Sequence, residues 1–174
     1  MKNHLRMILL ALAAALVLSA CGPSEADKEK AAEAAAAAEA AKPIPVPAAT
    51  ADKAAWQKYL VGVVRQNMQG VKTSHPFMYY VPPGDDDAAK SARESQLDNV
   101  SDTVARGVLP GNMLAFGGPD STITADLIIA AFQGANVGTF KNVVVLFVGA
   151  ATDNDRVKEA LAKSGAEYRF VEMK

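Results

Sequence analysis

Residues 143–173 read VVVLFVGAATDNDRVKEALAKSGAEYRFVEM, a polar segment between two apolar ones. The run 143–148 is apolar throughout and mostly β-branched, which is typical of a strand that is buried on both faces. Residues 153–163 have a helical pattern that ends at Gly165, and residues 168–173 again favour a strand. Such a strand–helix–strand unit with short connections predicts two parallel strands joined by a covering helix.

The same alternation extends toward the amino terminus. The predicted strands cover residues 76–81, 113–116, 143–148 and 168–173. The helices predicted between them begin within 85–89 and cover 122–135 and 153–163. A further helix precedes the first strand, with Thr50 or Asp52 as its cap and these apolar side chains at helical spacing: Trp56, Tyr59, Leu60, Val63, Val64 and Met68. The sequence therefore predicts an α/β fold, a small three-layer domain of about four mostly parallel strands with helices on both faces.

Residues 24–42 consist largely of Ala, Glu and Lys, which are strong helix formers. They carry no large apolar residues at heptad spacing, so we prefer a solvated spacer to a coiled coil. In residues 43–47 proline occupies every second position, which favours an extended, semi-rigid chain. We therefore predict a tether over residues 21–49 and a globular domain over residues 50–174.

The first residues have the pattern of a signal peptide. Lys2 and Arg6 are followed by an apolar run over 7–18, which is shorter than the roughly 20 residues that a membrane-spanning helix needs. The run ends at Leu18-Ser19-Ala20-Cys21, which resembles the lipobox of bacterial lipoprotein precursors. An ordinary secretory signal with an incidental cysteine and an uncleaved anchor helix are the alternatives, and Cys21 is the only cysteine in the chain.

The resemblance implies that residues 1–20 are removed and that the Cys21 thiol receives a diacylglycerol. It also implies that the new amino terminus receives a fatty acid such as palmitate. Several acyl chains together hold a protein on a membrane lastingly. Gly22 stands where aspartate would favour the inner membrane in the enterobacterial pattern, which favours an outer-membrane protein that faces the periplasm.

The composition restricts the partners that we expect. The formal net charge is −1 at pH 7, and loss of Lys2 and Arg6 with the leader makes it −3. This balance gives no electrostatic reason to expect a nucleic-acid partner or an anionic lipid surface. A mature chain whose only cysteine is lipidated has no internal disulfide, so its stability must come from its core.

Acidic residues follow the first three predicted strands. They are Asp85, Asp86 and Asp87 after the first, Asp120 after the second, and Asp153 and Asp155 after the third. The carboxyl ends of parallel strands meet at one edge, where open α/β sheets bind ligands, and oxygen ligands there can hold magnesium or calcium. Asp87, Asp120 and Asp153 are the weak candidates for such a metal site. We prefer the alternative that these carboxylates cap helices.

Catalytic motifs are missing from the sequence. The turn Gly117-Gly118-Pro119 precedes a helix but lacks the Gly-Lys-Ser/Thr of a nucleotide-binding loop. His75 is the only histidine outside the leader, and no Gly-x-Ser-x-Gly elbow is present. We therefore expect a protein without a cofactor that is not an enzyme.

Two functional hypotheses follow. The first is a membrane-anchored envelope lipoprotein whose periplasm-facing domain binds an envelope or secreted protein, as an inhibitor of the immunity type or as an accessory to secretion or assembly. The alternative is a metal-dependent enzyme or small-ligand binder that uses the acidic loops.

Overall fold

The structure is a computed structural model of the whole chain, and it describes residues 43–174. These residues form one compact unit, Pro43–Lys174. The leader, Cys21 and most of the predicted tether lie outside the described residues.

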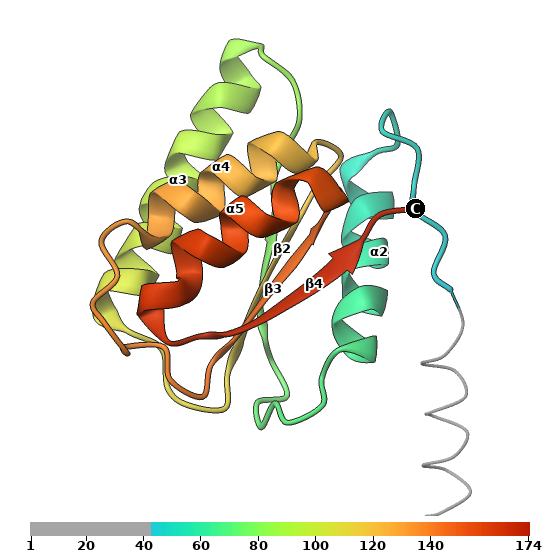
Figure 1. Cartoon of the computed structure of the whole chain (residues 1–174). Coiled ribbons are helices and arrows are strands. Elements are labelled where there is room, and N and C mark those ends of the chain that lie inside the picture. Colours follow the sequence, from blue (N-terminus) through green and yellow to red (C-terminus); the bar gives the residue numbers. More distant parts are fainter. Residues whose placement is uncertain (1–42) are drawn as a thin grey trace, which may run out of the picture. The chain divides into compact units, whose positions relative to one another are not determined.

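Four strands form a single parallel sheet in the order β1-β2-β3-β4, and Figure 1 shows β2, β3 and β4 side by side. The strands are β1 (Phe77–Tyr80), β2 (Met113–Gly117), β3 (Val144–Gly149) and β4 (Glu167–Glu172). Every residue of β2 and β3 is buried, because each of these strands has a neighbour on both sides and helices on both faces. The predicted α/β class, the parallel strands and their positions are confirmed.

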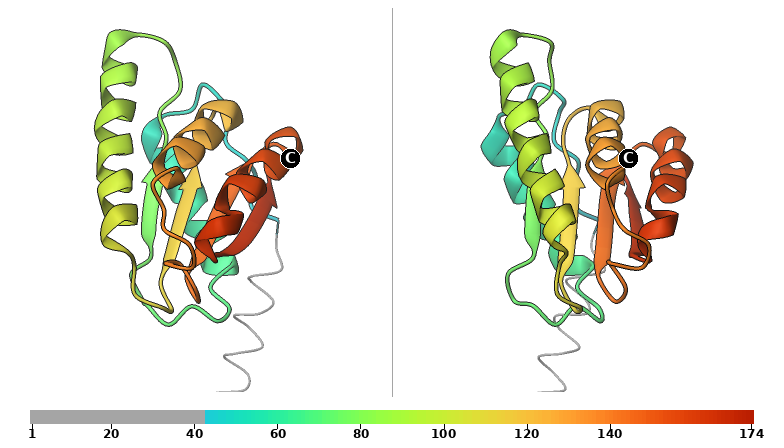
Figure 2. Two further views of the ribbon diagram at one scale, coloured as in Figure 1. Left: turned by 60° about the vertical axis from the view of Figure 1, so that its left-hand side comes forward. Right: turned by 90° about the vertical axis from the view of Figure 1, so that its left-hand side faces the viewer.

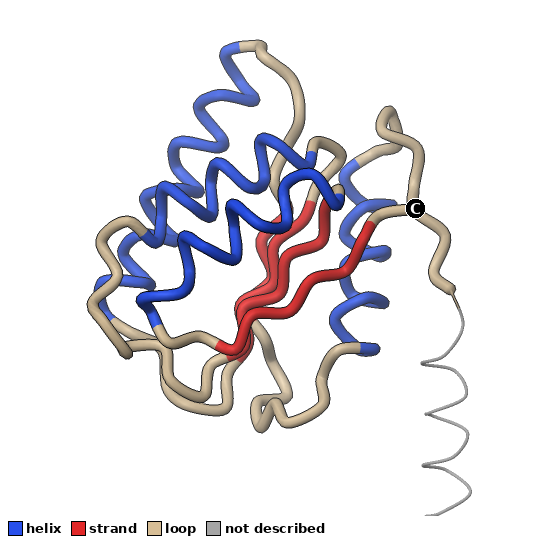
Figure 3. The backbone as a smooth tube through the Cα atoms, in the orientation of Figure 1, coloured by secondary structure: helices blue, strands red, loops and turns tan. Residues whose placement is uncertain are grey.

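The helices cover the two faces of the sheet unequally. Three of them follow β1, β2 and β3 and lie together on one face: α3 (Asp87–Arg106), α4 (Ser121–Phe132) and α5 (Ala151–Leu161). The 3₁₀ turn η1 (Ala162–Ser164) continues α5, and α2 (Lys53–Gln66) covers the opposite face alone. Consecutive parallel strands with crossovers of one hand place every connecting helix on the same side. Figures 2 and 3 show the resulting three layers.

Two apolar cores result, one on each face of the sheet. Along β3 the side chains alternate: Val145 and Phe147 pack under α3, α4 and α5, whereas Leu146 packs under α2. The α2 core also contains Trp56, which is almost fully buried. The other apolar residues predicted for this helix pack in the same core, and Asp52 is its cap, accepting a hydrogen bond of 2.7 Å from the amide of Ala55.

The proline-rich segment packs against the domain, although its sequence is typical of a tether. Ile44 and Val46 are half-buried against the α2 core. A Cβ atom at Gly62 would lie only 2.8 Å from Cδ1 of Ile44, so glycine allows this close approach. The indole of Trp56 donates a hydrogen bond of 3.2 Å to the carbonyl of Ala48. The alternating prolines favour an extended chain, and both Ile44 and Val46 pack against the α2 core.

Candidate functional site

The carboxyl edge of the sheet, where the four strands end, carries acidic residues that cap helices. Oδ1 of Asp86 accepts a hydrogen bond of 2.9 Å from the amide of Ala89, in the first turn of α3. Oδ1 of Asp120 accepts one of 2.9 Å from the amide of Ile123, in the first turn of α4. These bonds satisfy amides that the helix itself leaves without partners. The capping interpretation of Asp120 is confirmed.

The three candidate metal ligands are not brought together. Asp87 is exposed in the first turn of α3, Asp120 caps α4, and Asp153 is buried in the first turn of α5. Across residues 43–174 no three side chains of the types His, Cys, Asp and Glu form a group that could hold a metal ion. Each of the three carboxylates instead lies at the start of its own helix.

The strand order also bears on ligand binding at this edge. Ligands of open α/β sheets bind where the strand order reverses, because the helices on the two sides of that point cover opposite faces and leave a crevice. In this sheet the order runs from β1 to β4 without a reversal. The helices α3, α4 and α5 stay on one face, so no crevice of that kind opens between them.

Ser121 and Asp153 join the starts of α4 and α5. The Ser121 hydroxyl donates a hydrogen bond of 2.5 Å to Oδ2 of Asp153 and accepts one of 2.7 Å from the amide of Ala150. Ala150 is the N-cap residue of α5 and forms no side-chain cap, and the Ser121 hydroxyl gives the amide of Ala150 a partner from the neighbouring helix. This pairing gives the buried Asp153 carboxylate a structural role.

Arg156 extends this contact to the surface. Its Nε donates a hydrogen bond of 2.9 Å to Oδ1 of Asp153, and its Nη1 lies 2.5 Å from Oδ1 of Asp126 on α4. The hydrogen bond to Asp126 is the main reason that the pKa of Arg156 is raised. One guanidinium therefore holds carboxylates of two helices. The sequence did not show that Ser121 and Arg156 join α4 to α5, because the partners of these contacts between helices are about thirty positions apart.

His75 and the glycine turn have ordinary structural roles. His75 is exposed in the loop before β1, at the end of the sheet opposite the carboxyl edge, and its Nδ1 lies 2.8 Å from the Ser74 hydroxyl. At Gly118, a Cβ atom would lie 2.1 Å from the carbonyl oxygen of Val81. Glycine is therefore needed so that the chain leaving β2 can pass the chain leaving β1.

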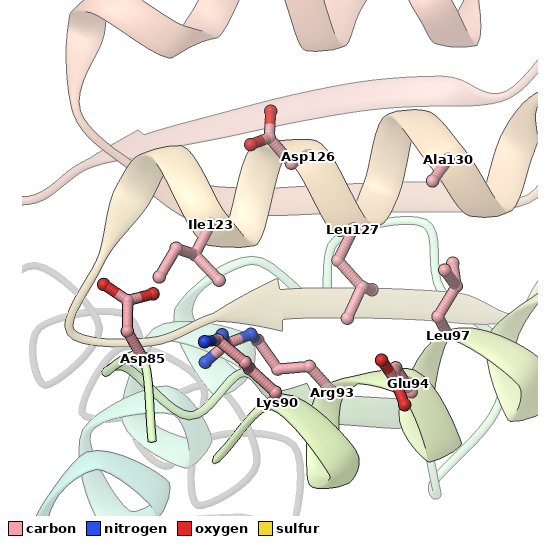
Figure 4. A pocket seen from close by; sticks show the side chains of 9 residues that line it. All are labelled: Asp85, Lys90, Arg93, Glu94, Leu97, Ile123, Asp126, Leu127 and Ala130. Atoms are coloured by element: carbon pink, nitrogen blue, oxygen red, sulfur yellow. The ribbon is translucent and has the colours of Figure 1, made fainter. Parts of the chain in front are cut away.

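A groove with charged rims lies between α3 and α4 (Figure 4). It is open to solvent and has a volume of about 390 Å³. Its apolar lining consists of Leu97, Ile123, Leu127 and Ala130. Its charged lining consists of Asp85, Lys90, Arg93, Glu94 and Asp126. An apolar floor with charges of both signs around it suits a ligand or partner with an apolar centre and a polar rim.

Arg93 fixes one end of this groove. Its Nη1 donates hydrogen bonds of 3.0 Å to the carbonyl of Pro82 and 2.7 Å to the carbonyl of Gly84, so α3 holds the loop that leads into it. Of the acidic residues highlighted in the sequence, only Asp85 lines the groove. In the sequence, the groove is indicated only by the helical spacing of Ile123, Leu127 and Ala130 along α4. Because most of this helix is apolar, its sequence does not show which apolar side chains the neighbouring helix leaves exposed.

A second hollow lies on the other side of α3. It has a volume of about 380 Å³ and is lined by side chains of α2, β1, the turn after β1, and α3: Lys53, Gln57, Met78, Tyr80, Pro82, Ala92 and Gln96. Phe77 and Met78 of the edge strand β1 are 43% and 45% exposed. The first half of α3, residues 87–97, thus separates two hollows. Figure 2 shows this half extending past the ends of α4 and α5.

Comparisons with models of known families, with curated proteins and with solved structures found no match to this chain. Within residues 43–174 no helix has both the length and the apolar character needed to span a membrane.

Proposed function

We propose that this chain is the precursor of a lipid-anchored protein of the bacterial cell envelope whose α/β domain binds a protein partner through the first half of α3. The anchor is Cys21, at the end of a leader that resembles those of lipoprotein precursors. The domain faces the periplasm from the outer membrane, and its partner is another envelope protein or a secreted one. It acts as an inhibitor of the immunity type or as an accessory subunit of a secretion or assembly complex.

The observation that carries the proposed partner binding is the position of the first half of α3 between two hollows. Exposed residues of this segment, such as Lys90, Ala92 and Glu94, stand between an apolar groove on one side and the exposed Met78 on the other. A partner that lies over this helix can place apolar side chains in both hollows. Aromatic or aliphatic anchors in adjacent pockets, surrounded by a polar rim, are the usual arrangement of a protein interface.

The charges suggest how such a partner would be oriented. Lys90 and Glu94 are four residues apart on one side of the groove, and Asp126 lies on its opposite wall. A complementary partner would present an acidic group to Lys90 and a basic group to Glu94. Charges at the rim of an interface select the partner and its orientation more than they add affinity.

The partner contact is tested by replacing Ala92 in the full chain with a photo-crosslinking amino acid, in cells that make the protein. We expect one defined protein adduct from this position and none from Lys158, an exposed position on α5. Exchanging the charges, Lys90→Glu with Glu94→Lys, leaves the net charge unchanged and should reduce the adduct. The matched exchange Lys158→Glu with Glu159→Lys should not. Equal adducts from both positions, or an adduct insensitive to the first exchange, would contradict the proposal.

The anchor is tested separately by labelling cells with a radioactive fatty acid. The unmodified chain should incorporate the label, and Cys21→Ser should not, because serine lacks the thiol that receives the diacylglycerol. Equal incorporation by the two chains would rule out Cys21 as the anchor.

A further inference from the structure

The amino edge of the sheet, where the four strands begin, is a continuous platform. It is built from the connections at residues 67–76, 107–112, 133–143 and 162–166, which lie along the lower and left-hand sides of the domain in Figure 1. Backbone hydrogen bonds link each connection to the next: Lys72 N to Gly111 O at 2.8 Å, Gly111 N to Asn142 O at 2.6 Å, and Gly138 N to Lys163 O at 3.1 Å. The platform is therefore preorganised by the fold.

The four connections at this edge carry basic residues but no acidic ones, and the acidic Glu167 that follows the fourth is paired with Arg169. The connections carry Lys72, Lys141 and Lys163, and Arg106 ends the helix that leads into the second. Within residues 43–174 none of these four cations forms a salt bridge, and the Lys163 ammonium donates a hydrogen bond of 3.0 Å to the carbonyl of Gln133. The net charge of the whole chain does not show this local excess of basic residues.

The most exposed large apolar side chains lie at the same edge. Leu109 is 78% exposed and Val137 is 86% exposed. They belong to the second and third connections, which are joined by the hydrogen bond between Gly111 and Asn142. Protruding aliphatic side chains among lysines favour an interface between water and lipid, where the aliphatic groups leave water and the ammonium groups stay near the headgroups.

The chain also enters the domain from the side of this edge. The carbonyl of Ala48 accepts a hydrogen bond from Trp56, in the first half of α2, whereas Ile44 lies against Gly62, in its second half. The segment from Ala48 back to Pro43 therefore runs along α2 toward the amino edge, where α2 ends. The proposed anchor residue Cys21 lies 22 positions before Pro43.

We propose that the amino edge is a docking surface for an anionic phospholipid bilayer, with Leu109 and Val137 entering the headgroup layer and the four basic residues above it. The inference rests on the proposed anchor, which supplies the bilayer, and it adds the orientation of the domain. In that orientation the carboxyl edge and the first half of α3 point away from the membrane, which leaves both hollows accessible to a partner.

The test uses the full chain with the substitution Val137→Trp, reconstituted into vesicles that contain lipids brominated on their acyl chains. The native Trp56 is buried in the domain and serves as an internal reference. We expect bromine to quench the emission of the introduced indole in vesicles of phosphatidylglycerol and phosphatidylethanolamine in equal parts. It should not do so in pure phosphatidylcholine, and added salt should weaken the quenching by screening the charges.

Lysine substitutions separate docking from tethering. One lysine near an anionic surface changes the ratio of docked to undocked chains about fivefold, so Lys72→Gln with Lys141→Gln should lower this ratio about 25-fold. The arginine pair Lys72→Arg with Lys141→Arg should retain the quenching. The matched control Lys53→Gln with Lys90→Gln removes two charges near the other edge and should have no effect.

The docking surface would be ruled out if the introduced indole were quenched in neither kind of vesicle, or equally in both. It would also be ruled out if the two glutamine pairs, at Lys72 and Lys141 and at Lys53 and Lys90, lowered the quenching equally. A fourth contradicting result is that an acidic protein, but not lipid, shields the introduced indole. Vesicle flotation and fatty-acid labelling report the anchor alone. A failed anchor would give an unlabelled chain that still floats with anionic vesicles, whereas failed docking would give a labelled chain without quenching.

Discussion

Replacing Ser121 by alanine removes the hydroxyl that joins the starts of α4 and α5. Two hydrogen bonds are lost: the one of 2.5 Å to the Asp153 carboxylate and the one of 2.7 Å from the amide of Ala150. Because Asp153 is only 6% exposed, water cannot fully replace the lost donor. Arg156 remains paired with the other carboxylate oxygen, so the charge is not left alone.

The expected loss follows from these two bonds. A hydrogen bond to a charged group contributes about 1.5 to 3 kcal/mol, and an unsatisfied polar group costs about 1 to 3 kcal/mol when it is buried. The amide of Ala150 is only partly buried, so its share is small. We therefore expect Ser121→Ala to lower the free energy of unfolding by about 2 to 3 kcal/mol.

Urea denaturation of the full chain measures this loss. With a slope of about 1 to 3 kcal/mol per molar urea, the midpoint should fall by on the order of 1 M without a change in slope. Thr122→Ala is the matched control, since this neighbour on α4 is exposed and its substitution should change stability by less than about 0.5 kcal/mol. A Ser121→Ala variant as stable as this control would refute the role assigned to the hydroxyl.

Three further predictions use the same measurement. Asp120→Asn should be nearly neutral, because asparagine caps as well as aspartate, whereas Asp120→Ala should cost about 0.5 to 2 kcal/mol; equal losses would contradict a capping role. Ile44→Ala should lower the free energy of unfolding by about 1 to 2 kcal/mol, which is less than for a fully buried isoleucine. A chain that starts at residue 48 should still unfold cooperatively, but at a lower urea concentration. If Ile44→Ala does not change the free energy of unfolding, the proline-rich segment is only a tether. Burial and the nearby Asp155 raise the pKa of Tyr168, so the unfolded chain loses the phenol proton at a lower pH than the folded chain. The free energy of unfolding should therefore fall as the pH rises above about 10, and it should fall less steeply in Tyr168→Phe. Equal slopes in the two chains would contradict this.

Much of the fold could be predicted because its signals are local. The apolar run at 143–148 corresponds to the buried β3, and the spacing of Trp56, Leu60 and Val63 corresponds to the buried side of α2. The caps at Asp52 and Asp120 could be predicted for the same reason, since a cap and the amide that it accepts from are three residues apart.

The candidate surfaces could not be predicted in the same way. The groove between α3 and α4 depends on which stripe of an apolar helix the neighbouring helix leaves uncovered, and that is a property of two helices together. Acidic residues at the strand ends were the sequence's clearest candidates for ligands, because carboxylates commonly bind metal ions. In the structure Asp86 and Asp120 bind backbone amides, and Asp153 binds Ser121 and Arg156.

The sequence by itself determined the alternation of strands and helices and the acidic character of the turns after the strands, because both depend on residues close together in the chain. Only the tertiary structure decided the sheet order without a reversal, the contact of Ser121 with Asp153, and the gathering of Lys72, Lys141 and Lys163 at one edge. These features join residues that are about 20 to 90 positions apart, and parallel pairing with helical crossovers brings them together. The net charge of a chain does not show where its charges lie, so the local group of lysines at the amino edge exists only once the chain is folded.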